Sequence, residues 1–114
     1  MLLSRTRWFA PDSAVGVWWL AHCHGFRVEP PPYHGPAGTV HDVGLRKVGG
    51  RAELLIVRIG AGRVTRVLAT TEVAAVDPER RVIRLHTSLR RAARLAKRHA
   101  RRQGREGELR LARE

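Results

Sequence analysis

Cysteine and aromatic residues are scarce in this sequence, and each scarcity excludes a class of structure. The single cysteine, Cys23, rules out a disulfide within the chain and is typical of a reducing compartment, so we expect a cytoplasmic protein. Only 5% of the residues are aromatic although 43% are hydrophobic, so aliphatic side chains must form most of the core. No apolar stretch approaches the roughly 20 residues that span a bilayer, and the first residues lack the apolar centre of a signal peptide.

Acidic residues are absent between Glu79 and Glu106, a stretch that contains eleven Lys and Arg. The net charge of the chain is +12. Residues 88–114 hold ten basic and three acidic residues and thus contribute +7 of it. More than half of the excess charge therefore lies in less than a quarter of the chain. This clustering indicates an acidic or polyanionic partner, with solubility as the simpler alternative.

The aliphatic residues divide the chain into two parts. All twelve Val and all three Ile lie between Val15 and Ile83, whereas the large aliphatics beyond Arg84 are all Leu. Because β-branched residues suit strands and unbranched residues suit helices, we predict a mainly β protein with a C-terminal helix. A length of 114 residues favours one compact core.

Several short strands are expected, separated by Gly, Pro and Asp turns. Gly60-Ala61-Gly62 predicts a hairpin, and Asp77-Pro78-Glu79-Arg80 predicts a type I turn. So many short strands with few residues for crossovers favour a small antiparallel β-barrel. The expected strands are Val15–Glu29 as one curved strand, Thr39–Lys47, Glu53–Ile59, Val64–Ala69, Thr70–Val76 as a short strand or a single turn, and Val82–His86.

A basic helix is predicted at Leu89–Gln103, which contains no Gly, Pro or β-branched residue. Ser88 is its expected N-cap, and Gly104 is expected to end it after about four turns. A thin apolar stripe, mostly Ala, allows the helix to pack weakly against the barrel. The residues after Gly104 are expected to fray. The predicted divisions are an N-terminal arm at 1–14, the barrel at 15–87, and the basic helix and tail at 88–114.

The stretch Gly38-Thr39-Val40-His41-Asp42-Val43 is similar to the Gly-x-Val-x-Asp-Val strand of the PRC-barrel domain. Further stretches at 54–59, 67–68, 72–77 and 82–85 follow the layout of the same family, and the preceding strand at 21–28 extends the similarity. Residues 15–87 thus resemble this small barrel, which the photosynthetic reaction-centre H subunit shares with the C-terminal half of a ribosome-maturation factor. The resemblance implies a domain for docking and assembly and not for catalysis.

One local cluster, His22-Cys23-His24, carries side chains that ligate zinc or copper. In a strand the two His share one face and Cys23 points to the other, so His34 or His41 would have to complete a metal site. The same geometry separates Cys23 from a His that could activate it as a nucleophile. We therefore expect no catalytic residue, no metal and no cofactor, and we expect that the protein is not an enzyme.

The basic helix is the sharpest functional feature of the sequence. Pairs such as Arg90/Arg94 and Arg94/Arg98 place like charges one turn apart, each costing a few tenths of a kcal/mol. RNA or DNA would relieve this repulsion and release counterions, so RNA, DNA or a ribonucleoprotein is the expected partner. The predicted anion-binding residues are Arg90, Arg91, Arg94, Lys97, Arg98, Arg101, Arg102 and Arg105.

Other partners stay open. An acidic protein fits the charge of the helix, whereas a membrane surface is disfavoured because the Ala stripe lacks the Trp, Phe and Leu that an interfacial helix buries. Trp18 and Trp19 could stack on bases if exposed, although we expect at least one of them to fill the barrel. The main alternative is a homodimer formed through strand edges or an apolar patch, with the basic tail serving solubility.

Overall fold

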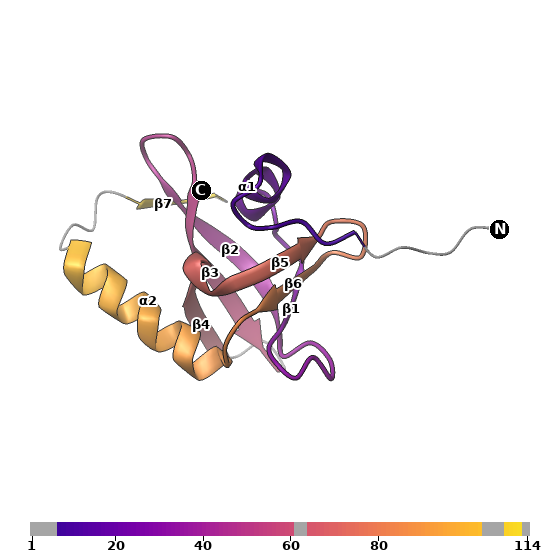
Figure 1. The fold of residues 1–114 in the computed structure, drawn as a ribbon. Coiled ribbons are helices and arrows are strands. Elements are labelled where there is room, and N and C mark those ends of the chain that lie inside the picture. The colour runs from indigo at the N-terminus through magenta and orange to yellow at the C-terminus, as the bar shows by residue number, and fades with distance from the viewer. Residues whose placement is uncertain (1–6, 61–63, 104–108, 113–114) are drawn as a thin grey trace.

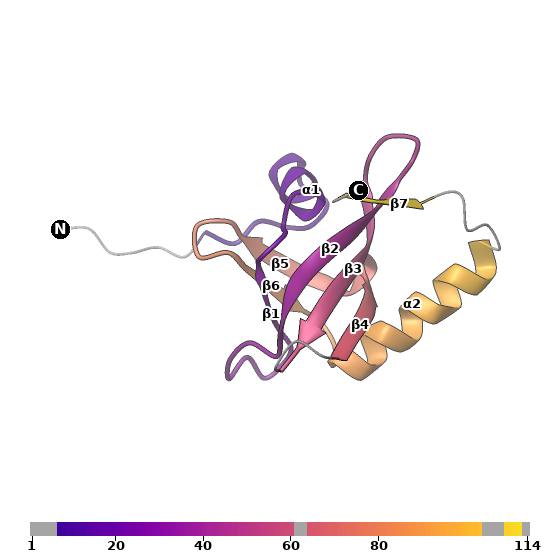
Figure 2. The ribbon, with the colours of Figure 1, turned by 180° about the vertical axis from the view of Figure 1, so that it is seen from behind.

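The computed structural model describes residues 7–60, 64–103 and 109–112 (Figures 1 and 2). It contains a curved sheet with one short helix at its N-terminal end and a longer helix along β4 (Figure 2). In chain order the elements are α1 (Ala14–Ala21), β1 (Arg27–Glu29), β2 (Gly38–Arg46), β3 (Ala52–Ile59), β4 (Val64–Ala69), the 3₁₀ turn η1 (Thr70–Glu72), β5 (Val73–Asp77), β6 (Val82–Leu85), α2 (Leu89–Gln103) and β7 (Leu109–Leu111).

The seven strands form one mixed sheet with the order β4-β3-β2-β1-β6-β5, and β7 pairs with β2. The prediction of a mainly β chain with a C-terminal helix is confirmed. The prediction that the sheet is antiparallel is wrong, because β1 runs parallel to β6. In the part of the chain that the structure describes, no pairing joins β4 to β5, so the sheet is open between these two strands.

The strands from β2 onward follow the expected pattern closely. β4 covers the predicted residues Val64–Ala69, β3 begins one residue before the predicted Glu53, and β2 is shifted by one residue towards the N-terminus at both ends. These strands contribute much of the core, with Leu55 and Val57 of β3 and Leu68 of β4 fully buried. Thr70–Val76, predicted as a strand or a turn, is both: η1 leads directly into β5.

Residues 14–21 form helix α1, so the prediction of one curved strand over Val15–Glu29 is wrong. Ser13 caps the helix, because its Oγ accepts a hydrogen bond from the Gly16 amide at 3.0 Å. The Val and Trp residues of this segment favour a strand locally, but the helix buries Leu20 in the core. Tertiary packing thus overrides local preference here. The strand that follows, β1, is only three residues long.

The N-terminal segment lies against the sheet at two points. Phe9 forms an antiparallel bridge with Val76, with N···O distances of 2.8 and 2.9 Å. The Arg84 guanidinium stacks between two rings, 4.5 Å from the centroid of Trp8 and 4.6 Å from that of Tyr33. These contacts connect the start of the chain to the β5–β6 hairpin.

Helix α2 occupies the predicted residues, and Ser88 caps it by accepting a hydrogen bond from the Arg91 amide at 3.2 Å. The expectation that the chain frays after Gly104 is wrong for Leu109–Leu111, which form β7 and pair with the end of β2. Residues 104–108 lie outside the described residues. The Ala112 amide adds a hydrogen bond of 2.9 Å to the carbonyl oxygen of Val43. Within the described residues, no helix has the length and apolar character needed to cross a membrane.

Gly16 allows a direct test of how closely α1 packs against the preceding turn. A Cβ at this position would lie 1.9 Å from the carbonyl oxygen of Ala10. Helix propensity alone would make Gly16→Ala stabilising by about 1 kcal/mol, but we expect the clash with the backbone to dominate and to destabilise the protein by about 1–3 kcal/mol. Urea unfolding monitored by circular dichroism measures this difference.

The matched control is Val15→Ala in the same helix, at a side chain that is exposed. We expect it to change the free energy of unfolding by no more than about 0.5 kcal/mol. A Gly16→Ala variant as stable as the wild type would contradict the seating of α1 described above.

Candidate anion-binding face

Helix α2 packs on the sheet through small side chains. Ala92 is fully buried and Ala96 is 3% exposed, and the helix lies against β4. These two residues are four apart and so occupy one side of the helix. Because Ala side chains are short, the helix backbone approaches the strand closely, and the long basic side chains are left on the other sides.

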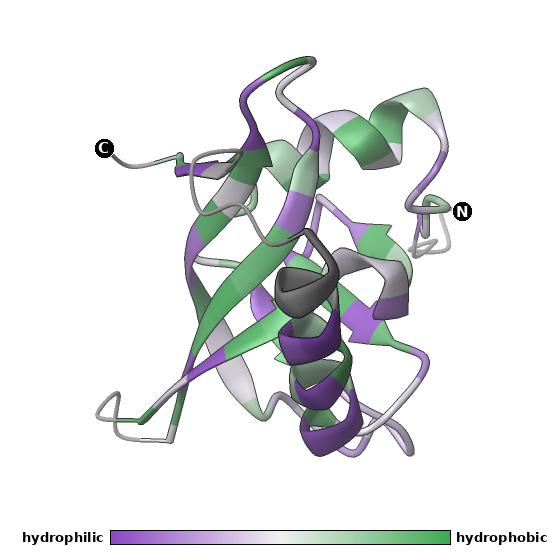
Figure 3. Cartoon of the chain, turned by 90° about the vertical axis from the view of Figure 1, so that its left-hand side faces the viewer, coloured by the Kyte–Doolittle hydropathy of each residue, from purple (hydrophilic) through white to green (hydrophobic). Residues whose placement is uncertain are grey.

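The basic residues of α2 that the structure describes are all exposed. Within the described chain, none of them forms an ion pair with a carboxylate. Figure 3 shows bands of hydrophilic colour along α2. The exposed residues are Arg90, Arg91, Arg94, Lys97 and Arg98.

Three predicted residues are placed less fully. Arg101 and Arg102 belong to the last turn of α2, but their side chains lie outside the described part of the chain. Arg105 lies outside the described residues altogether. Seven of the eight predicted cations thus belong to helix α2, and the five whose side chains are described are exposed. Anion binding by all eight stays a prediction.

Sequence reasoning missed Arg66, an exposed residue of β4. It lines the same groove as Arg90, Arg94 and Lys97, because α2 runs beside β4. Nothing in the local sequence around Arg66 marks it as part of a basic site. β4 and α2 become neighbours only in the folded protein, because the chain after β6 runs back alongside β4.

The cluster at residues 22–24 does not adopt the strand geometry that was expected. His22 ends α1, and its Nδ1 donates a hydrogen bond to the carbonyl oxygen of Trp18 at 2.8 Å. Cys23 is fully buried, whereas His24 is exposed beside His41, with ring centroids 6.4 Å apart. Among the described residues, no three His, Cys, Asp or Glu side chains are grouped so that they could hold a metal ion.

The two adjacent tryptophans have different environments. Trp19 packs against the core, whereas Trp18 is 53% exposed. The Trp18 ring stacks on His22 with a centroid distance of 4.0 Å. One tryptophan therefore contributes to the core, as expected, and the other presents an aromatic surface to solvent.

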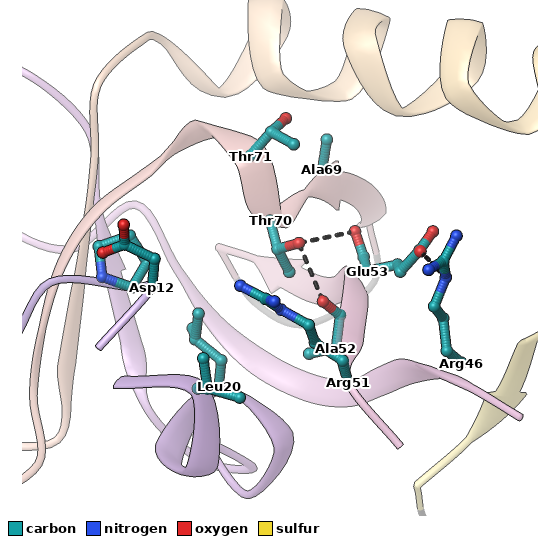
Figure 4. Close-up of a pocket in the computed structure, with 11 residues that line it drawn as sticks. Asp12, Leu20, Arg46, Arg51, Ala52, Glu53, Ala69, Thr70 and Thr71 are labelled. Atoms are coloured by element: carbon teal, nitrogen blue, oxygen red, sulfur yellow. Dashed lines mark hydrogen bonds and ion pairs between the residues drawn. The ribbon is translucent and has the colours of Figure 1, made fainter. Parts of the chain in front are cut away.

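A cleft of about 380 Å³ lies between α1, the β2–β3 hairpin and η1 (Figure 4). Arg46 forms an ion pair with Glu53 at its edge, and the Thr70 hydroxyl contacts two main-chain carbonyl oxygens of β3, each at 3.1 Å. Figure 4 shows Arg51 pointing into the cleft. The described residues that line this cleft include no His or Cys, so it does not bring together a nucleophile and an imidazole base.

Burial determines the chemistry of the one thiol. Removal from water raises the pKa of Cys23 from 9.0 to about 12. The thiol also donates a hydrogen bond to the carbonyl oxygen of Leu20 at 3.3 Å. Because the thiolate is the nucleophilic form, Cys23 is unreactive near neutral pH.

This pKa predicts a loss of stability in alkali. Above pH 9 the unfolded chain releases the Cys23 proton while the folded chain keeps it, so the free energy of unfolding falls as the pH rises towards 12. We expect wild type to lose about 1.4 kcal/mol more than Cys23→Ala between pH 8 and pH 10. Urea unfolding of both proteins at the two pH values measures this, and an equal pH dependence would contradict it.

Comparison with known proteins assigns no family to this arrangement. No protein-family model matches the chain, and neither do curated proteins or solved structures. The function must therefore be inferred from the residues of the chain itself.

Proposed function

We propose that this protein is a non-enzymatic binding module that uses the exposed basic face of α2 to contact RNA or a ribonucleoprotein. A PRC-barrel-like arrangement of the sheet and a cytoplasmic location belong to the same proposal. The observation that carries it is the packed position of α2, which holds Arg90, Arg94 and Lys97 on one flank and Arg91 and Arg98 on another. Such a helix presents a preformed basic surface and not a flexible charged tail.

Like charges on α2 repel one another. Arg90, Arg94 and Arg98 follow one another at intervals of one turn, and within the described chain no carboxylate pairs with them. Phosphate groups would offset this repulsion and release condensed counterions, which favours binding. The contacts come from charge alone, so we expect little preference for nucleotide sequence.

The salt dependence of RNA binding tests this proposal. If five to eight cations engage phosphates, the slope of log K against log salt concentration is about −4 to −7. Filter binding of an RNA duplex between 50 and 300 mM NaCl measures the slope. Replacing Arg91 and Arg98 with Ala should make it less steep by about 2.

Arg27→Ala serves as the matched control, since Arg27 is an exposed arginine of β1 and not of α2. Its slope should stay within about 1 of the wild-type value. Absence of RNA binding at 50 mM NaCl would overturn the proposal, and so would equal slopes for all three proteins.

Self-association is a second candidate function, favoured by α1. This helix carries no charged residue, and Trp18 and Val15 are 53% and 41% exposed. An exposed apolar helix face of this kind is typical of a protein interface. The basic face would then serve solubility.

The second candidate predicts a dimer that depends on Trp18. Light scattering of the wild type at 200 µM should give twice the chain mass of 12.8 kDa, and Trp18→Ser should give the monomer mass. Val48→Ser removes another exposed apolar residue, outside α1, and should leave the dimer intact. A monomeric wild type would contradict this candidate.

A further inference from the structure

A groove with a volume of about 820 Å³ runs between α2 and strand β4. Four cations line it, namely Arg66 from β4 and Arg90, Arg94 and Lys97 from α2. All four are exposed, and the described residues that line the groove include no Asp or Glu. The groove is therefore complementary to a partner that carries several negative charges.

The groove also has apolar walls, which a purely electrostatic site does not need. Leu54 and Val67 contribute aliphatic side chains from β3 and β4, and Ala93 and Ala96 contribute methyl groups from α2. Val67 is 40% exposed although it lies in the middle of a strand. Covering these residues with apolar side chains of a partner would add hydrophobic stabilisation to the charge contacts.

We propose that this groove binds an acidic segment of a partner protein in which Asp or Glu residues are interspersed with aliphatic residues. The carboxylates contact the four cations and the aliphatic side chains cover Val67 and Leu54. Nucleic acid fits the groove less well, because bases stack on aromatic rings and no aromatic residue is among those that line it.

This inference goes beyond the proposed RNA contact, because it adds a protein partner at one flank of α2. Arg91 and Arg98 are seven residues apart, so they lie on one side of the helix, and neither lines the groove. They remain accessible when the groove is occupied. Arg90, Arg94 and Lys97 belong to both surfaces, so an acidic segment in the groove would compete with RNA for these three cations.

A pair of synthetic peptides tests the occupant. The first is a fluorescein-labelled 12-residue peptide with eight Glu and four Leu, and the second has Ser in place of each Leu. Because both carry the same charge, fluorescence anisotropy titrations separate the apolar contribution from the electrostatic one. We expect the Leu peptide to bind at least about tenfold more tightly to the full chain, and to keep this advantage in 500 mM NaCl.

Two substitutions one turn apart on α2 locate the site. Arg94→Glu changes a cation that lines the groove, whereas Arg98→Glu makes the same change of charge outside it. We expect Arg94→Glu to weaken binding of the Leu peptide at least about tenfold, and Arg98→Glu to weaken it less than about threefold. Circular dichroism confirms that both variants, changed at exposed positions, keep the helix.

Val67→Ser tests the apolar wall, and its expected effect is a reduced preference for the Leu peptide over the Ser peptide. Equal affinities of the two peptides for the wild type would overturn the inference, and so would equal losses in the two Arg variants. RNA filter binding with the same proteins distinguishes the RNA proposal from the groove proposal. RNA binding without a preference for the Leu peptide overturns only the proposed peptide site in the groove. A peptide preference without RNA binding overturns only the RNA contact.

Discussion

The sheet depends on the parallel pairing of one three-residue strand, Arg27–Glu29, with β6. This pairing joins two otherwise separate antiparallel pieces, the β2–β3–β4 meander and the β5–β6 hairpin. Val28 is fully buried at the junction, and the Glu29 carboxylate accepts a hydrogen bond from Arg84 Nε at 3.2 Å. Without the junction neither piece could cover the apolar face of the other, so the core and the position of α2 both follow from it.

The position of α2 shows how the same residues serve packing and charge. Small residues at positions 92 and 96 let the helix lie close to β4, where larger side chains would hold it away. The Arg and Lys side chains of α2 that the structure describes then face the solvent or the groove. The stability of the contact comes from the sheet side of the helix, which leaves the opposite side unconstrained by folding and available for a partner.

The sequence predicted those elements whose signals are local. The bounds of α2 followed from Ser88 and from the absence of helix-breaking residues, and those of β4 followed from the glycines before it. Helix α1 was missed because its Val and Trp residues favour a strand when considered alone, whereas the helix buries Leu20 and packs Trp19 against a core that no local pattern shows. The groove was missed because it needs β4 and α2 to lie side by side, which no local pattern encodes.

The pairing of β7 with β2 has a consequence for how the protein meets its partners in solution. Helix α2 is followed by a strand that returns to the sheet and is preceded by β6, so it is anchored through both of its neighbouring elements. The described basic side chains of α2 are therefore held in a fixed position relative to the sheet. For the proposed RNA contact, a basic face held in one position would attract the polyanion over a distance and so raise the rate of association.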